Sequence, residues 1–202
     1  MGATRKISSV SDNVLFDANL LKNLDFESLV GVFSPPITAT EPGEPWLLVR
    51  PLELEDFHKG FVQLLTQLTA VGNITQNEFE RQFATMKAAG QYYITVIEDT
   101  RSNRIIGAAS LVTEYKFIHR CGLRGRLEDV VVNNTYRGKQ LGKLIVMTVS
   151  LLAKHLGCYK MSLDCKDPLI PFYKTLGYKC EPGNSNSMVV RYEGPSQPDT
   201  GS

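Results

Sequence analysis

The sequence has few of the features that mark metal-binding, disulfide-rich or nucleic-acid-binding proteins. Its four cysteines form no CxxC pair, and its three scattered histidines lack the acidic spacing of a metal-ligand set. The formal net charge of the 202-residue chain is +1, so no overall field attracts nucleic acid or acidic lipid. We therefore expect reduced thiols, no bound metal and no nucleic-acid partner.

Long apolar runs are also missing. No run approaches the ~20 residues that span a bilayer, and the N-terminus lacks the apolar core of a secretory signal. We expect a cytoplasmic protein without a transmembrane segment. Peripheral association with endomembranes stays open.

Length and composition predict one globular domain with loose ends. Hydrophobic residues make up 43% and charged residues 21% of the chain, as in soluble globular proteins. Residues 46–193 are expected to form this domain, and residues 194–202, rich in Pro, Ser and Gly, a disordered tail. Residues 1–45 are expected to be a partly flexible N-terminal extension, whose apolar residues could pack on the domain as an arm: Leu20, Leu21, Leu24 and Phe26.

The periodicity of apolar residues predicts a mixed α/β fold. Helical spacing predicts helices over Leu54–Thr69 and from Leu141, and a capping box at Thr75–Glu78 begins a helix over 76–89 that Gly90 ends. The remaining elements are a short helix at 171–176 and strands at 46–50, 92–98, 104–116, 127–132 and 159–163, near Tyr178 and at 188–192. Short connections favour antiparallel hairpins, and the helix from Leu141 forms a crossover to a parallel strand.

A strand, a basic glycine-containing loop and a helix follow one another in EDVVVNNTYRGKQLGKL, residues 128–144. A helix start offers unpaired backbone N–H groups, and glycine lets an anion approach them, so Arg137–Gly142 is a candidate cradle for a pyrophosphate. The other interpretation is a turn with solvated basic side chains. The spacing fits neither GxxxxGK[ST] nor GxGxxG, which weakens nucleoside triphosphate and dinucleotide binding.

The segment resembles motif A of the GNAT N-acetyltransferase superfamily, Q/R-x-x-G-x-G/A, with Gln140 in place of the usual first glycine. Together with QLTAVG, YKFIH, GCYKMSLDC and FYKTLGY, it resembles the eukaryotic glucosamine-6-phosphate N-acetyltransferase family over about residues 46–192. The resemblance implies a GNAT fold, in which helices flank a central mixed, mostly antiparallel twisted sheet. It also implies transfer of the acetyl group of acetyl-CoA to the 2-amine of glucosamine 6-phosphate, a step towards UDP-N-acetylglucosamine, by a homodimer with its substrate site at the subunit interface.

The same resemblance implies which residues hold the coenzyme. The Val130 and Val132 backbone would pair with the pantetheine arm, and one N–H group would donate to the thioester oxygen. At Leu169 relatives often have Asn, so contact there depends on shape and backbone. The complete implied set is Val130, Val131, Val132, Arg137, Gly138, Lys139, Gln140, Leu141, Gly142, Leu169, Pro171 and Tyr173.

Catalytic roles are implied for Tyr173 as general acid toward the thiolate, Glu128 as candidate base and Asp164 as a further carboxylate or carbonyl. Without the resemblance, Tyr173 would be a packing aromatic, and the acids and cations would be surface residues. The partner subunit would supply Arg191. The implied substrate-binding set is Thr69, Lys116, Phe117, Ile118, His119, Glu128, Asp129, Val130, Asp164 and Arg191.

Two other functions remain open at this point. The fold could act on another amine, in a protein or a polyamine, although the cations of YKFIH and Arg191 favour a phosphorylated acceptor. It could also be a non-catalytic acyl-CoA-binding module, in which Tyr173 and Glu128 would be dispensable.

Overall fold

The computed structural model describes residues 11–29, 31–136, 138–183, 188 and 190. It divides into two compact units, Met1–Leu163 and Asp164–Ser202, which are described here one at a time.

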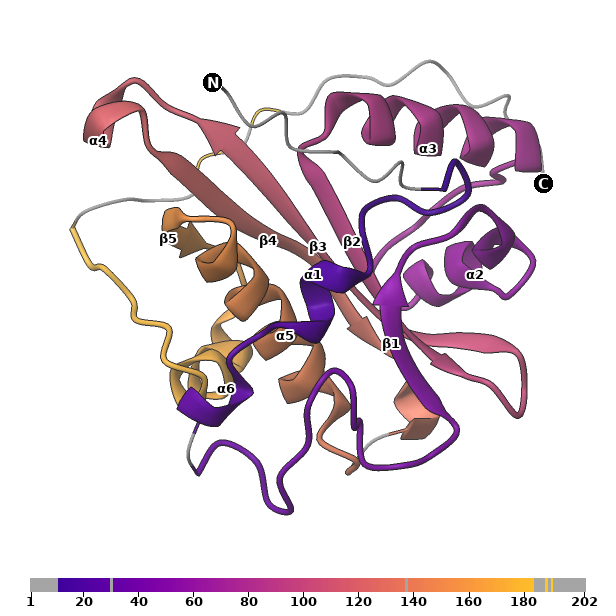
Figure 1. Ribbon diagram of the computed structural model, residues 1–202, viewed down its shortest axis with the longest axis horizontal. Coiled ribbons are helices and arrows are strands. Elements are labelled where there is room, and N and C mark those ends of the chain that lie inside the picture. The colour runs from indigo at the N-terminus through magenta and orange to yellow at the C-terminus, as the bar shows by residue number, and fades with distance from the viewer. Residues whose placement is uncertain (1–10, 30, 137, 184–187, 189, 191–202) are drawn as a thin grey trace, which may run out of the picture. The chain divides into compact units, whose positions relative to one another are not determined.

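A five-stranded sheet in the order β1-β2-β3-β4-β5 forms the centre of the first unit (Figure 1). Its strands are β1 (Leu47–Pro51), β2 (Tyr92–Asp99), β3 (Arg104–Tyr115), β4 (Leu123–Val132) and β5 (Cys158–Ser162). The first three pairings are antiparallel and β4 pairs with β5 in parallel, which confirms the predicted mixed sheet.

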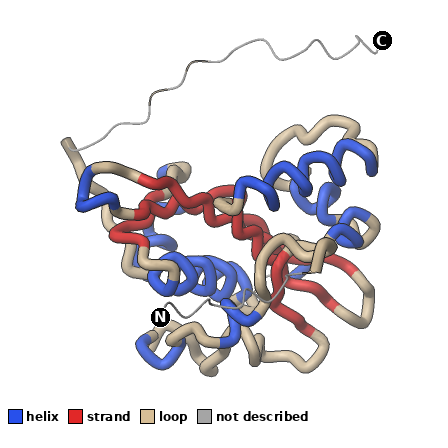
Figure 2. The backbone as a smooth tube through the Cα atoms, turned by 45° about the horizontal axis from the view of Figure 1, so that its top comes forward, coloured by secondary structure: helices blue, strands red, loops and turns tan. Residues whose placement is uncertain are grey.

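Helices cover both faces of this sheet. One face carries α5 (Leu141–His155), and α2 (Phe61–Leu65) and α3 (Gln76–Ala89) lie on the opposite face (Figure 2). Ten of the fifteen residues of α5 are buried, so this helix forms the largest part of the core beneath the sheet. The shorter elements of this unit are α1 (Asn19–Lys22), η1 (Phe26–Ser28), η2 (Leu54–Phe57), α4 (Ile118–Cys121) and η3 (Asn134–Tyr136).

The helices confirm one prediction from the sequence and contradict another. The capping box is confirmed, because Thr75 and Glu78 bond each other's backbone N–H groups and Gly90 ends α3 in a left-handed conformation. The single helix predicted over Leu54–Thr69 is wrong. Gly60, at φ 82°, separates η2 from α2, since a left-handed residue interrupts the right-handed helical turn.

The second unit contains η4 (Asp167–Leu169) and α6 (Ile170–Thr175), so the short predicted helix is present. Tyr173 of α6 is buried and lies in edge contact with the rings of Phe172 and Tyr178, at centroid distances of 5.1 and 5.7 Å. The strand predicted near Tyr178 is wrong, because this residue lies in no strand. The other predicted strand, 188–192, falls mostly outside the described residues.

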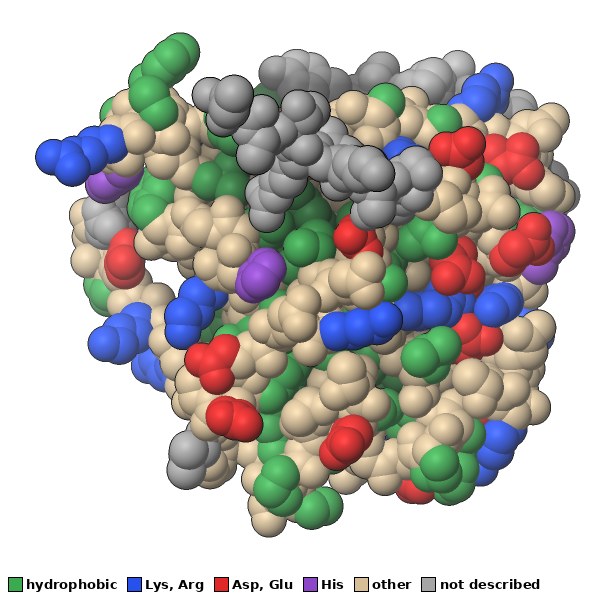
Figure 3. All heavy atoms as spheres, viewed as in Figure 1, with side chains coloured by type: hydrophobic (Ala, Val, Ile, Leu, Met, Phe, Trp, Pro, Cys, Tyr) green, Lys and Arg blue, Asp and Glu red, His purple; other side chains and the backbone are tan. Residues whose placement is uncertain are grey.

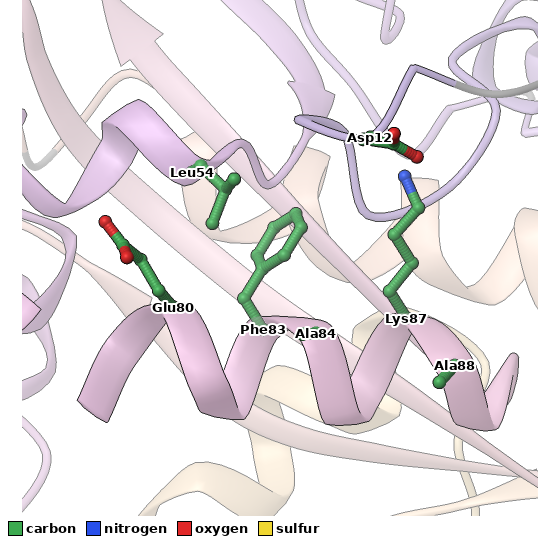
Figure 4. Close-up of a pocket in the computed structure, with 7 residues that line it drawn as sticks. All are labelled: Asp12, Leu54, Glu80, Phe83, Ala84, Lys87 and Ala88. Atoms are coloured by element: carbon green, nitrogen blue, oxygen red, sulfur yellow. The ribbon is translucent and has the colours of Figure 1, made fainter. Parts of the chain in front are cut away.

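The described part of the N-terminal extension, from Ser11, packs on the first unit. Val14 forms an isolated antiparallel bridge with Glu53, and the Lys87 ammonium donates to the carbonyl oxygens of Ser11 and Val14, the latter at 2.7 Å. Its buried apolar residues are Leu15, Phe16, Leu21, Phe33, Ile37 and Ala39. A pocket of about 400 Å³ lies between the start of this segment and α3, with the Lys87 side chain reaching towards Asp12 (Figure 4). None of the site residues predicted from the sequence lines this pocket.

An ion cluster is buried where β1 and β2 meet η2. Arg50 donates to both carboxylate oxygens of Asp56 at 2.8 and 2.6 Å, and to Glu98 at 2.9 and 2.6 Å. Lys59 donates to the other oxygen of Glu98 at 2.8 Å. Since Asp56 is fully buried, the arginine is required to balance its charge.

Candidate functional site

The middle of β4 is interrupted by a β-bulge. The register with β3 passes from Glu128, opposite Ser110, to Val131, opposite Ala108, so two residues of β4 face one residue of β3. The first of the two, Asp129, has a φ of 52°, which is uncommon for a residue other than glycine. A bulge bends its strand and often lies beside a functional site. The regular alternation of side chains between the two sheet faces is therefore interrupted at Asp129.

The second half of β4 has an open edge. Pairing with β5 runs from Leu123 opposite Cys158 to Arg126 opposite Ser162, where β5 ends. From Leu127 to Val132 the strand pairs with β3 on one side, and among the described residues no strand pairs with it on the other. An extended ligand could bond the exposed backbone groups of such an edge, as a further strand would. The predicted coenzyme residues Val130–Val132 lie on this edge.

The open strand leads into the N-terminus of α5 through η3. Gly138 lies in this loop at φ 84°, and a Cβ atom placed on it would meet no atom within 4 Å. Gln140 precedes the helix and its side chain forms no cap, so the first-turn N–H groups are not bonded by the residue that would normally satisfy them. Space beside Gly138 and uncapped N–H groups fit the pyrophosphate of coenzyme A. Arg137, predicted for the same cradle, lies outside the described residues.

Two side-chain contacts, which the sequence analysis did not identify, hold this loop. Gln67 accepts a hydrogen bond from the Asn134 N–H at 3.2 Å, which connects the segment carrying the predicted substrate residue Thr69 to the loop. The Tyr136 hydroxyl donates to the buried Asp99 carboxylate at 2.7 Å. Gln67 begins the QLTAVG segment and Tyr136 lies in the segment of residues 128–144, but no sequence signal assigned a contact to either, and none indicated Asp99.

The Asp99 carboxylate is ionised when it accepts the hydrogen bond from the Tyr136 hydroxyl. Hydrogen bonds from the Arg101 side chain, and then from Tyr136, keep the pKa of Asp99 far below its ordinary value despite its burial. The Arg101 guanidinium in turn lies 4.0 Å above the centre of the Trp46 ring. A charged acceptor makes a stronger hydrogen bond than a neutral one, so Asp99 fixes the position of the loop through Tyr136.

The two acids predicted to contact the substrate differ in their surroundings. Glu128 forms an ion pair with Arg126 of the same strand. Desolvation, and to a smaller extent the nearby Glu128 charge, raise the pKa of Asp129. A raised pKa brings a carboxylate closer to the range in which it exchanges protons, as catalytic acids and bases require.

The predicted substrate residues Lys116–His119 lie at the turn between β3 and β4. Tyr115 pairs with Leu123, five residues before Glu128, which at about 3.3 Å per residue places this turn roughly 16 Å along the strand from the acids. Lys116 bonds Glu114 at 2.5 Å, and the His119 ring stacks on Tyr159 at 4.3 Å. Within one chain, then, the predicted cations and acids are not brought together.

This turn is strained and apolar. His119, Arg120 and Cys121 have φ values of 52°, 58° and 56° in succession, a conformation that costs free energy in residues other than glycine. Tyr115, Phe117 and Ile118 are exposed by 77%, 95% and 64%, and hydrophobic side chains stand out over α4 in Figure 3. We call residues 115–121 the hairpin tip.

The remaining predicted site residues belong to the second unit or lie outside the described residues. Asp164, Leu169 and Pro171 are exposed, whereas Tyr173 is buried. Burial, and to a smaller extent Cys165, raise the pKa of Tyr173, so its phenol stays protonated at neutral pH. Arg191 is outside the described part of the chain.

The described residues contain no metal-ligand cluster and no membrane-spanning helix. No group of three or more His, Cys, Asp or Glu side chains among them is arranged to hold a metal ion. None of their helices is both long and apolar enough to cross a membrane.

Known proteins share this sequence and arrangement. Residues 53–178 match the model of the acetyltransferase (GNAT) family. The chain is 63% identical over 191 residues to the probable glucosamine 6-phosphate N-acetyltransferase of Drosophila melanogaster, covering 94% of this chain and 87% of that protein. It is 41% identical over 145 residues to the glucosamine 6-phosphate N-acetyltransferase of Arabidopsis thaliana, covering 71% and 95%.

Solved structures agree with this match. The crystal structure of glucosamine-6-phosphate N-acetyltransferase from Arabidopsis thaliana superimposes with a TM-score of 0.69 at 39% identity, over 73% of this chain and 99% of that one. An acetyltransferase from Trypanosoma brucei gives a TM-score of 0.66 at 32% identity, over 72% and 99%. The open-edged strand, the uncapped helix and these relatives lead to one conclusion: this chain belongs to the acetyltransferase (GNAT) family.

Proposed function

We propose that this protein transfers the acetyl group of acetyl-CoA to the 2-amine of glucosamine 6-phosphate, yielding N-acetylglucosamine 6-phosphate and CoA in the synthesis of UDP-N-acetylglucosamine. The observation that carries the proposal is the 63% identity, over 94% of the chain, to a relative named for this reaction. Acetyl-CoA is the cosubstrate of GNAT acetyltransferases and supplies the acetyl group as a thioester.

Two features of the first unit support the binding of that cosubstrate. The open edge of Val130–Val132 suits the amides of the pantetheine arm, and the α5 N-terminus suits its pyrophosphate. Lys139, whose half-exposed side chain pairs with Glu44, places a positive charge beside the first turn. Arg137, Leu169 and Pro171 remain proposed contacts on the basis of sequence alone.

The acceptor amine must be neutral to attack, and β4 supplies two acids for this. Glu128, the candidate base from the sequence, is neutralised in part by Arg126, which suits it to hold an ammonium group. Asp129 has the raised pKa and is a second candidate for taking up the proton. Asp164 is proposed to add a carboxylate or a backbone carbonyl.

Tyr173 is proposed as the general acid. When the amine nitrogen bonds to the acetyl carbon, the C–S bond breaks and the leaving thiolate takes a proton. A phenol whose pKa burial has raised stays protonated and can donate that proton. Its buried ring, held between Phe172 and Tyr178, limits the directions in which the hydroxyl can point.

The proposed enzyme is a cytoplasmic homodimer with its substrate site at the subunit interface. The hairpin tip supports this, because three large exposed apolar side chains form a patch that a partner would bury. The tip also carries Lys116 and His119, and the turn that holds them starts roughly 16 Å along the strand from Glu128 and Asp129 of the same chain. A second chain could supply these cations, and Arg191, to the first chain's acids.

The release of free thiol from acetyl-CoA tests the proposal. We expect rapid release with glucosamine 6-phosphate and at least a hundredfold lower kcat/KM with unphosphorylated glucosamine, because removal of the phosphate leaves the cationic groups unpaired. Equal rates with both sugars would contradict the assigned acceptor. Faster turnover of a polyamine or a lysine peptide would establish another acceptor. Coenzyme binding without any turnover would indicate that the protein is a non-catalytic acyl-CoA-binding module.

A further inference from the structure

The side chain of Gln140 faces the N-terminal segment instead of capping its own helix. Its amide oxygen accepts a hydrogen bond from the Ser34 N–H at 3.0 Å, and its amide nitrogen donates to the Pro35 carbonyl oxygen at 3.3 Å. No side-chain cap to α5 forms. Both ends of one amide are thus bonded to a backbone more than one hundred residues earlier in the chain.

The backbone at Gln140 has an unfavourable conformation. Its φ of 58° and ψ of 10° lie in the left-handed region, which glycine adopts readily and other residues adopt at a cost. This is the position where the motif resembled by the sequence usually has glycine. A residue held in such a conformation persists when its surroundings fix it, and here the surroundings are Ser34 and Pro35.

The N-terminal segment is also held by contacts that do not involve Gln140. Residues 32–44, which we call the arm loop, bury Phe33 and Ile37, with 8% and 6% of their surfaces exposed. A turn closed by the hydrogen bond from the Thr38 N–H to the Glu41 carbonyl, at 3.0 Å, shapes its middle. The arm loop therefore has packing contacts of its own in addition to its two hydrogen bonds with Gln140.

Two neighbours of Gln140 also contact the arm loop. Lys139 pairs with Glu44 at 2.8 Å, and the Lys143 ammonium lies 3.5 Å from the Val32 carbonyl oxygen. Both cations have flexible side chains, and the Lys139–Glu44 pair is partly exposed, so these contacts constrain the backbone less than the amide of Gln140 does.

We propose that the arm loop is a structural part of the coenzyme site, and that Gln140 is a positioning residue through which it fixes the left-handed turn before α5. This inference rests on the proposed function, because it assigns the first-turn N–H groups to the coenzyme pyrophosphate. The turn sets the direction of those N–H groups, and the amide bonds hold the turn. By thermodynamic linkage, coenzyme binding should then also stabilise the arm loop.

Variants of the full-length protein test this with coenzyme A as the probe. In titration calorimetry, Gln140→Ala should weaken CoA binding about five- to tenfold, because it loses both hydrogen bonds and keeps the strained φ. Gln140→Gly should weaken it only two- to threefold, since glycine adopts the turn without strain. Glu44→Gln is the matched control: it removes the exposed arm contact and leaves the Lys139 charge in place, so it should not weaken CoA binding.

Amide hydrogen exchange supplies a readout that does not depend on turnover. CoA should slow exchange of arm-loop amides in the wild-type protein and in Glu44→Gln, but not in Gln140→Ala or Gln140→Gly. Wild-type CoA affinity in both Gln140 variants, or arm-loop exchange that CoA leaves unchanged in the wild type, would overturn this inference while the proposed function stands. A wild-type protein that binds no CoA would instead overturn the proposed function, and with it the role of Gln140. Should Gln140→Ala fail to fold, Gln140→Gly decides.

Discussion

Replacing Arg50 with Met should destabilise the first unit strongly. The change removes two hydrogen bonds, of 2.8 and 2.6 Å, from the fully buried Asp56. It also leaves Lys59 as the remaining cation bonded to Glu98 in the described part of the chain. Removing one partner from a buried ion pair costs about 3–5 kcal/mol. For a chain of this size, each kcal/mol lowers the melting temperature by about 2–4 °C, so we expect a decrease of roughly 6–20 °C.

Arg50→Met should also change how the free energy of unfolding depends on pH. Although burial opposes it, hydrogen bonds from Lys59 and Arg50 lower the pKa of Glu98 below its ordinary 4.5. A carboxyl group with a lowered folded-state pKa contributes stability above its unfolded pKa and loses it as the pH falls through the folded one. The wild-type protein should therefore lose stability below about pH 4.5. Arg50→Met should lose less stability over that range, because the pKa of Glu98 is lowered less when Arg50 is absent.

Urea denaturation between pH 3 and pH 8 measures both effects. Glu44→Gln, which removes the exposed pair with Lys139, is the control and should change the free energy of unfolding by less than about 0.5 kcal/mol. A loss below about 1 kcal/mol for Arg50→Met at pH 7 would refute the reasoning, since it would mean that water or another cation reaches Asp56 readily.

The remaining predictions concern turnover. Tyr173→Phe should lower kcat at least tenfold with little change in CoA affinity, because the phenol proton is used as the bond to sulfur breaks; unchanged kcat in steady-state assays would remove it from the mechanism. Asp129→Asn should fold like the wild type, because Asn accepts a φ of 52°, yet it should lose activity and the acid limb that Asp129 gives to the pH profile of kcat/KM. If Glu128→Gln removes that limb instead, Glu128 is the base. Arg191→Ala should raise the KM for the sugar phosphate. An effect confined to the KM for acetyl-CoA would show that Arg191 does not bind the sugar phosphate.

Features set by neighbouring residues could be predicted from the sequence. The ends of α3 follow from Thr75, Glu78 and Gly90, whose side chains or backbone freedom act within four residues. The strand, loop and helix from Glu128 onward were predicted for the same reason. Helix prediction failed at Gly60, because apolar periodicity continues across a glycine whether or not the backbone turns left-handed there.

Features set by distant residues could not be predicted. The bulge at Asp129 depends on the register with Ser110 and Ala108, and the amide of Gln140 meets Ser34 and Pro35 from a segment predicted to be partly flexible. The Tyr136–Asp99 bond likewise joins two residues 37 positions apart. In each case the sequence supplied the residue but no local signal for its partner.

The bulge in β4 also has a consequence for how this enzyme family can diversify. One inserted residue changes the phase in which side chains alternate, so the segments before and after Asp129 are assigned to the sheet faces independently. Under the proposed function, Lys116–His119 would bind the acceptor before the bulge and Val130–Val132 would bind the coenzyme after it. Substitutions at the hairpin tip would then leave the direction of the Val130–Val132 amides unchanged, so the acceptor could vary while the donor stays the same.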